Sequence, residues 1–185
     1  MATELALKTS DFETEVLQSQ VPDHVAGRLE IRSVPAEDAD LPQFDLLYAG
    51  YSLPFLGADA FDRFWSAVRD RLRPGGILIV NFFGPRDSWA GRDGMRFIDV
   101  VEVRRLVDGL ELLALDEEDQ DGDSFLGPKH WHVFDVIARQ PAGDIWPAKE
   151  REQARHSQNR LRQLPACWVR NHLNMAGLLP EIWST

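Results

Sequence analysis

Three adjacent residues, Asp87, Ser88 and Trp89, offer a carboxylate, a hydroxyl and an indole a few residues after a strongly apolar run. A carboxylate in such a place can hold a substrate or accept its proton. Asp and Ser also favour turns, because their side chains bond nearby backbone groups. Tyr51 follows another apolar run and can either touch a ligand or cover the ends of the strands. Asp87 and Tyr51 are therefore candidate catalytic residues, each with a structural alternative.

Two histidines, a run of acids and one cysteine raise the questions of a metal site and a nucleophile. His130 and His132 alternate along one predicted strand face, yet the sequence shows no third ligand beside them. Asp119 and Asp121 belong to an acidic run that imitates a calcium loop, but the glycine and the final glutamate of such a loop are missing. We predict no metal. Cys167 has no base close to it in the sequence, so packing is the simpler interpretation.

The elements that must position these residues follow an α/β pattern. Residues 28–34 alternate charged and apolar side chains, as a half-buried strand does. Residues 44–49 are almost continuously apolar, which is typical of a strand buried on both faces of a parallel sheet. A helix is predicted over 58–72, ended by Arg-Pro-Gly-Gly, with a second buried strand over 77–83. This order predicts a right-handed βαβ unit with parallel strands.

The remaining elements are predicted at the two ends of the chain. Residues 9–20 and 100–109 have helical spacing, and the second helix ends at Gly109. Residues 110–115 and 131–138 read as strands, with 116–123 as a charged turn between them. Together the two strands predict an antiparallel hairpin at the edge of the sheet.

Composition limits the partners and divides the chain in two. The formal net charge is −10, and 26 of the 30 acids lie within residues 1–140, which argues against nucleic acid as a partner. No apolar run is long enough to span a membrane, and acids interrupt the N-terminus, so no secretory signal is predicted. With a single cysteine, the expected location is cytoplasmic. We expect one α/β domain over 1–140 and a helical extension over 141–185.

Three stretches together resemble a known family. They are FDLLYAGYSLPF (44–55), LRPGGILIVNFFGPRDSW (72–89) and GPKHWHVFDVIAR (127–139). They resemble the C-terminal portion of class I S-adenosylmethionine-dependent methyltransferases, near the tellurite-resistance-type group that acts on small molecules. The implied fold class is α/β, a truncated Rossmann-like methyltransferase sheet, mostly parallel with a C-terminal antiparallel hairpin.

The resemblance implies a cofactor, S-adenosylmethionine, above the carboxyl ends of the strands, where open α/β sheets bind ligands. It assigns adenine contacts to the acids after the first strand, and contacts to the methionine end of the cofactor to the turn after FDLL. The implied cofactor-binding residues are Glu37, Asp38, Ala49, Gly50, Tyr51 and Ser52. The segment with Asp87 is implied to approach the pocket of a small-molecule acceptor.

The sequence departs from the family pattern at its start. Gly27 is the only glycine before Gly50, so the glycine-rich cofactor motif is absent there. The chain is expected to begin within the helix before the family's third strand, without the central strand that pairs with 44–49. We expect either that 28–34 moves beside 44–49, or that a partner chain, such as a second copy, covers that edge.

Two functions follow from this balance. The first is methyl transfer to a small molecule, with cofactor and acceptor held in line. The second is a catalytically inactive remnant that acts as a binding or oligomerisation module. The three family-like stretches support the enzyme, and the absence of the glycine-rich cofactor motif supports the inactive remnant. The sequence therefore leaves the choice between them open.

Overall fold

The computed structural model describes residues 4–8, 29–124 and 126–142. Short strands β1 (Glu4–Lys8) and β2 (Leu29–Ser33) come first, followed by the 3-10 turn η1 (Ala36–Asp38). The central unit is β3 (Phe44–Ala49), the 3-10 turn η2 (Leu53–Phe55), helix α3 (Ala58–Arg71) and β4 (Leu72–Phe83). Helix α4 (Val100–Leu106) and the strands β5 (Glu111–Ser124) and β6 (Gly127–Arg139) complete the described chain.

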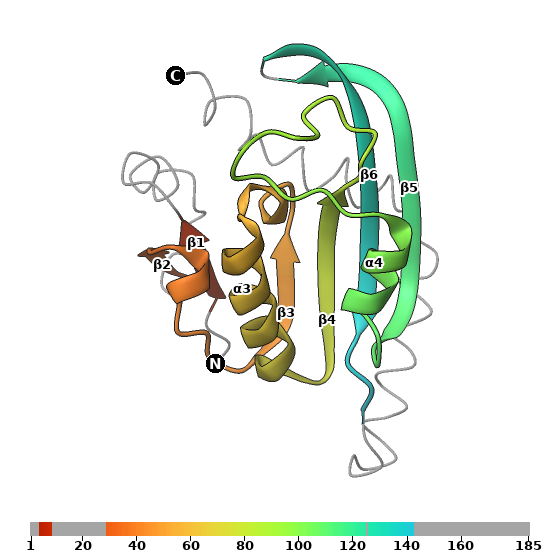
Figure 1. Cartoon of the computed structure of the whole chain (residues 1–185). Helices are drawn as coiled ribbons and strands as arrows, with labels where there is room; N and C mark the ends of the chain where they lie inside the picture. The colour runs from red at the N-terminus through yellow and green to blue at the C-terminus, as the bar shows by residue number, and fades with distance from the viewer. Residues whose placement is uncertain (1–3, 9–28, 125, 143–185) are drawn as a thin grey trace.

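Four strands form the main sheet in the order β3-β4-β6-β5. Strands β3 and β4 are parallel and joined through α3, which confirms the predicted βαβ unit. Strand β6 is antiparallel to both β4 and β5, so the last two strands form the predicted hairpin. Figure 1 shows α3 and α4 on the same face of this sheet. The predicted α/β fold class is confirmed.

Helix α3 forms because its apolar residues recur at three- and four-residue steps and so share one face. That face packs on the sheet through four buried side chains, those of Phe61, Phe64, Trp65 and Val68. The Phe61 and Trp65 rings stack with their centroids 5.9 Å apart, and the Trp65 indole donates to the Leu106 carbonyl at 3.1 Å. The helix ends at Arg71, one residue before its predicted end, and Arg-Pro-Gly-Gly lies within the first residues of β4.

The hairpin corrects one local prediction. The acidic run 116–123 is not a turn, because β5 continues through it to Ser124 and pairs with β6 along that whole length. Cross-strand partners explain this outcome: Asp119 lies opposite His132 and Asp121 lies opposite His130. Acids that find cationic or donor partners across a ladder are compatible with a strand, although their propensity alone argues against one.

The start of the chain corrects three more expectations. Residues 4–8 form strand β1, whereas we expected the chain to begin in a helix, and β1 pairs in parallel with β2. Strand β2 therefore does not lie beside β3, so the first proposed repair of the β3 edge is wrong. Among the described residues, β3 is hydrogen-bonded to β4 alone. It is not buried on both faces, because Leu46 is 59% and Tyr48 is 47% exposed.

Several expectations lie outside the described residues. These are the helix over 9–20, the helical extension over 141–185 beyond Ala142, and the packing of Cys167. In the described part of the chain, none of the helices combines the length and the apolar character that a membrane crossing requires.

Candidate functional site

The loops that follow β3 and β4 leave from the same end of the sheet, because the two strands are parallel. Figure 1 shows both loops above the carboxyl ends of these strands. Ligands of open α/β sheets bind at this end. The predicted segment 49–52 and the predicted Asp87 thus come to one end of the sheet.

An aromatic cluster fills the space between the two loops and β6. Phe83 and Trp89 are buried, while Tyr51, Phe55 and Trp131 are half-buried around them. Tyr51 meets both Phe83 and Trp131 edge-on, at centroid distances of 6.1 and 5.8 Å. Edge-to-face pairs at such distances are favourable arrangements of aromatic rings. This contact pattern agrees with Tyr51 as a cover over the strand ends, which was its structural alternative.

A buried ion pair lies under this cluster. Lys129 Nζ is 2.7 Å from Asp87 Oδ1, and the two side chains are only 2% and 0% exposed. The ammonium also lies 3.7 Å from the Trp89 ring centroid and 3.8 Å from that of Trp131, which are cation–π distances. Burial lowers the pKa of Lys129, and the hydrogen bond to Asp87 opposes that shift.

The carboxylate of Asp87 is fully engaged by these neighbours. Besides Lys129 it accepts the backbone N–H of Trp89 at 2.9 Å and that of His132 at 3.3 Å. A buried carboxylate with this many donors holds the loop in place. The geometry therefore favours a positioning role for Asp87, and its part in catalysis stays a prediction.

The loop from Gly84 to Ala90 is fastened to β6 by backbone bonds. Gly84 N–H donates to the His132 carbonyl at 2.7 Å, and Ser88 N–H donates to the His130 carbonyl at 3.0 Å. In return, His130 N–H donates to Ser88 Oγ at 2.8 Å. Gly84 is required for this approach, because a Cβ there would lie 2.0 Å from His132 Nδ1. The FGPRDSW and KHWHVF stretches, which carry part of the family resemblance, therefore contact each other directly.

The turn after β3 has an unusual backbone. Tyr51 has a φ of 52°, which lies in the left-handed region. Among the described residues other than glycine, it alone has a positive φ. Its N–H donates to Asn81 Oδ1 on β4 at 2.6 Å. Gly50 lies under the Tyr48 ring, and a Cβ there would be 2.2 Å from the Tyr48 hydroxyl. The segment predicted to pass the methionine end of the cofactor is therefore bonded to Asn81 and packed against the Tyr48 ring.

The predicted adenine contacts lie in a different place. Glu37 and Asp38 form η1, and Glu37 Oε1 is 3.9 Å from an Arg63 guanidinium nitrogen on α3. Figure 1 shows η1 beside α3, next to β1 and β2. This long, exposed ion pair places Glu37 beside the helix, and a contact of either acid with adenine stays a prediction.

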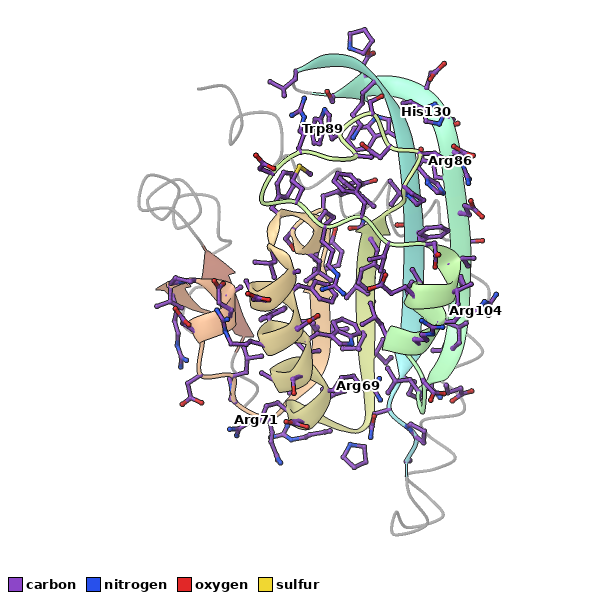
Figure 2. The ribbon with its side chains drawn as sticks, in the orientation of Figure 1. Arg69, Arg71, Arg86, Trp89, Arg104 and His130 are labelled. Atoms are coloured by element: carbon purple, nitrogen blue, oxygen red, sulfur yellow. The ribbon has the colours of Figure 1, made fainter. Side chains whose placement is uncertain are left out.

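His130 takes part in a network of charged side chains on the surface of the hairpin. His130 places Nδ1 2.8 Å from Asp121 and Nε2 2.7 Å from Asp119, and these two acids raise its pKa. A neutral imidazole has only one N–H, so this geometry favours the imidazolium. Arg86 and then His130 lower the pKa of Asp119 to about 2. Figure 2 shows Arg86 and His130 next to each other along the hairpin.

His132 is buried and uses both ring nitrogens. Nδ1 accepts the Arg86 backbone N–H at 3.1 Å, and Nε2 lies 3.0 Å from Glu117 Oε1. Nδ1 therefore carries no proton, and the Nε2–H donates to the carboxylate. Among the residues that the structure describes, no group of three or more possible ligands is arranged for a metal ion.

A shallow crevice lies beside the aromatic cluster, and its side chains leave no room inside it even for a water molecule. Its lining is mostly apolar and includes Leu53, Phe83 and Arg96. Pockets that enclose a drug-sized ligand usually measure at least about 300 Å³. The crevice is thus too small to enclose a nucleoside-sized ligand.

Sequence reasoning missed three residues of this region: Asn81, Lys129 and Asp135. Asn81 is buried between apolar neighbours of a strand, where only its polar character stands out. Lys129 directly precedes the alternating histidines, and nothing in the sequence signals that it turns inward. Asp135 interrupts an apolar run, which is the one signal that sequence offers for it.

No protein-family model and no curated protein sequence matches the chain. Solved structures do match. TehB from Haemophilus influenzae superimposes with a TM-score of 0.62 at 10% identity, over 75% of this chain and 50% of that chain. A SAM-dependent methyltransferase from Methanosarcina mazei gives 0.55 at 15% identity, over 74% and 81%. This chain therefore spans about half the length of the TehB chain.

A third structural match is to an enzyme whose printed name describes a different reaction. The [4+2]-cyclase SpnF superimposes with a TM-score of 0.57 at 16% identity, over 77% of this chain and 67% of that chain. At these identities the likeness concerns the fold, and one fold hosts different reactions. The chain has the class I methyltransferase fold, as the resemblance of its three stretches implied.

Proposed function

We propose that this chain binds S-adenosylmethionine at the carboxyl ends of β3 and β4 and supports methyl transfer to a small molecule. The observation that carries the proposal is the turn 49–52, in which Tyr51 is left-handed and donates to Asn81, at the end of the sheet where open α/β folds bind ligands. The half-buried rings of Tyr51 and Trp131 border this turn.

In this proposal the described residues form one side of the cofactor site. The turn after β3 and the aromatic cluster supply a rigid, largely apolar wall. Glu37 is bound to α3, and the crevice beside the cluster does not enclose a nucleoside. The second wall must come from residues outside the described ranges or from another chain.

The role of the described residues is positioning. When bound, S-adenosylmethionine would supply an electrophilic methyl group, its sulfur would keep the electrons of the broken bond, and the proton of the acceptor would pass to solvent. The aromatic cluster excludes water from this end of the sheet, and the ion pair beneath it fixes Trp89 and Trp131. Tight orientation of the reactants supplies much of the rate enhancement in reactions of this kind.

The second candidate is a catalytically inactive binding or oligomerisation module. The observation that favours it is the edge of β3, which carries two exposed apolar side chains, Leu46 and Tyr48. Unpaired strand edges are templates for pairing with another chain. In this proposal a partner chain, such as a second copy of this one, covers that edge.

Calorimetric titration with S-adenosylhomocysteine separates the two. We expect a dissociation constant in the micromolar range, and weakening by about tenfold or more, about 1.4 kcal/mol, in Ser52→Lys. Ser52 is exposed and makes no capping bond to η2, so the lysine blocks the turn without disturbing the fold. Ser66→Lys, on the exposed side of α3, is the matched control and should bind like the wild type.

No detectable heat at millimolar ligand would overturn the enzyme proposal and favour the inactive module. A micromolar affinity that is unchanged in Ser52→Lys would show that the ligand binds, but elsewhere.

A further inference from the structure

A chain of polar groups crosses the sheet on the face opposite α3 and α4. Asn81 on β4 lies directly opposite Asp135 on β6, between the cross-strand pairs Ile79–Ile137 and Phe83–Val133. Asn81 Nδ2 is 3.5 Å from Asp135 Oδ1, at the long end of a hydrogen bond. The other end of the same carboxamide accepts the Tyr51 N–H at 2.6 Å.

The Asn81 side chain has little freedom to serve any other purpose. It is 6% exposed, and buried carboxamides must satisfy both their donor and their acceptor. Its oxygen meets a backbone N–H and its nitrogen meets a carboxylate. The Tyr51 N–H and the acceptor on Asp135 together define which way the amide points, and an ionised Asp135 offers only acceptors to it.

Strands β4 and β5 flank Asp135 on β6, β3 lies one strand further away, and each of the three contributes one group to its surroundings. On β3 this is the phenol of Tyr48, whose pKa is raised by burial and by Asp135. On β4 it is the neutral Asn81, and on β5 it is Asp116, opposite Asp135 in the ladder. No lysine or arginine of the described chain forms an ion pair with Asp135.

We infer that Asn81 and Asp135 are positioning residues of the site: the carboxylate of Asp135 sets the orientation of the Asn81 amide, and that amide holds the left-handed turn at Tyr51. This inference refines the proposed function, since the turn belongs to the proposed cofactor site. Neither residue needs to touch a ligand, because both act through the backbone of the turn.

The protonation of Asp135 controls this arrangement. Burial raises its pKa to about 6, Asn81 opposes that shift, and the charge of Asp116 adds to it. When Asp135 is ionised, the Asn81 nitrogen faces it and the oxygen stays on Tyr51. When it is protonated, its O–H competes for the Asn81 oxygen and the bond to Tyr51 weakens. The turn is therefore held more firmly above the pKa of Asp135 than below it.

The pH dependence of folding stability runs in the opposite direction to that of the turn. A carboxyl whose pKa is higher in the folded state than in the unfolded chain binds its proton more tightly when folded. The contribution of Asp135 to stability is therefore largest at low pH and falls as pH rises through about 6. The chain carries this cost at neutral pH while the ionised group orders the turn.

An NMR titration of the free protein tests the inference without any ligand. We expect the Tyr51 amide proton to move downfield as pH rises through about 6, with the same midpoint as the Asp135 carboxyl carbon. Asp135→Asn, which keeps the shape of the side chain, should flatten the Tyr51 titration. Asp116→Asn, the matched control on β5, should keep the titration but lower its midpoint, since one neighbouring charge is removed.

A Tyr51 amide that stays unchanged while Asp135 titrates would overturn the inference. A Tyr51 titration that persists in Asp135→Asn would do the same, because another group would then be responsible. The experiment is independent of the proposed function: a protein that shows the titration yet does not bind S-adenosylhomocysteine refutes the cofactor proposal alone.

Discussion

Replacing Lys129 with methionine is expected to lower the free energy of unfolding by about 3–5 kcal/mol, because it leaves the carboxylate of Asp87 buried without its cation. The two side chains are 2% and 0% exposed, so water cannot replace the lost partner. The three aromatic rings around the ammonium lose their cation–π contacts at the same time. Urea unfolding followed by tryptophan fluorescence measures the change.

The double variant Lys129→Met/Asp87→Asn shows whether the cost comes from the pair. Asparagine keeps one acceptor for the backbone donors of Trp89 and His132 but carries no charge. We expect the double variant to be less destabilised than the sum of the single ones, with a coupling of about 1–3 kcal/mol. Additive losses would contradict the account.

A matched control comes from the surface of the same sheet. Arg73 and Asp45 form an ion pair at 2.9 Å, but their side chains are 46% and 73% exposed. Exposed pairs of this kind contribute about 0–1 kcal/mol. Arg73→Met should therefore have little effect, and an effect as large as that of Lys129→Met would show that burial is not the cause.

Substituting Gly84 by alanine is expected to destabilise the protein by about 1–3 kcal/mol or more, because the added methyl group overpacks a closed site. Its Cβ would lie within 2.0–2.5 Å of three atoms of the His132 ring. That ring cannot move aside, since it is 1% exposed and packs edge-on against Phe134 at 4.9 Å. Thermal unfolding by circular dichroism measures the loss.

The same substitution should also loosen the loop that carries Asp87. Hydrogen exchange at the Ser88 amide, which is bound to the His130 carbonyl, reports on this contact. Gly57→Ala is the control, because a Cβ at Gly57 meets nothing within 4 Å. If both variants lost equal stability, steric contact with His132 would not explain the glycine.

The sequence predicted the parts of the fold that rest on periodicity and on local turn chemistry. The apolar steps along α3 and the Arg-Pro-Gly-Gly stop defined that helix to within a residue of its end. The continuous apolar run of β4 and the βαβ order followed from the same pattern. These signals are local, so one sequence suffices for them.

The missed features depend on contacts between distant parts of the chain. The acidic end of β5 is a strand only because histidines of β6 and Arg86 lie across from it. Pairing of β1 with β2 joins segments whose partners no periodicity identifies. Lys129 and Asn81 acquire their roles from residues 42 and 30 positions away. Propensity carries no information about such partners.

The central claim is that the carboxyl ends of β3 and β4 form the binding site for S-adenosylmethionine. Amide chemical-shift mapping with saturating S-adenosylhomocysteine tests it most directly. The account predicts that the largest changes fall on residues 49–52 and on the indole N–H groups of Trp89 and Trp131. Changes confined to the hairpin end around His130, or no changes at all, would contradict it.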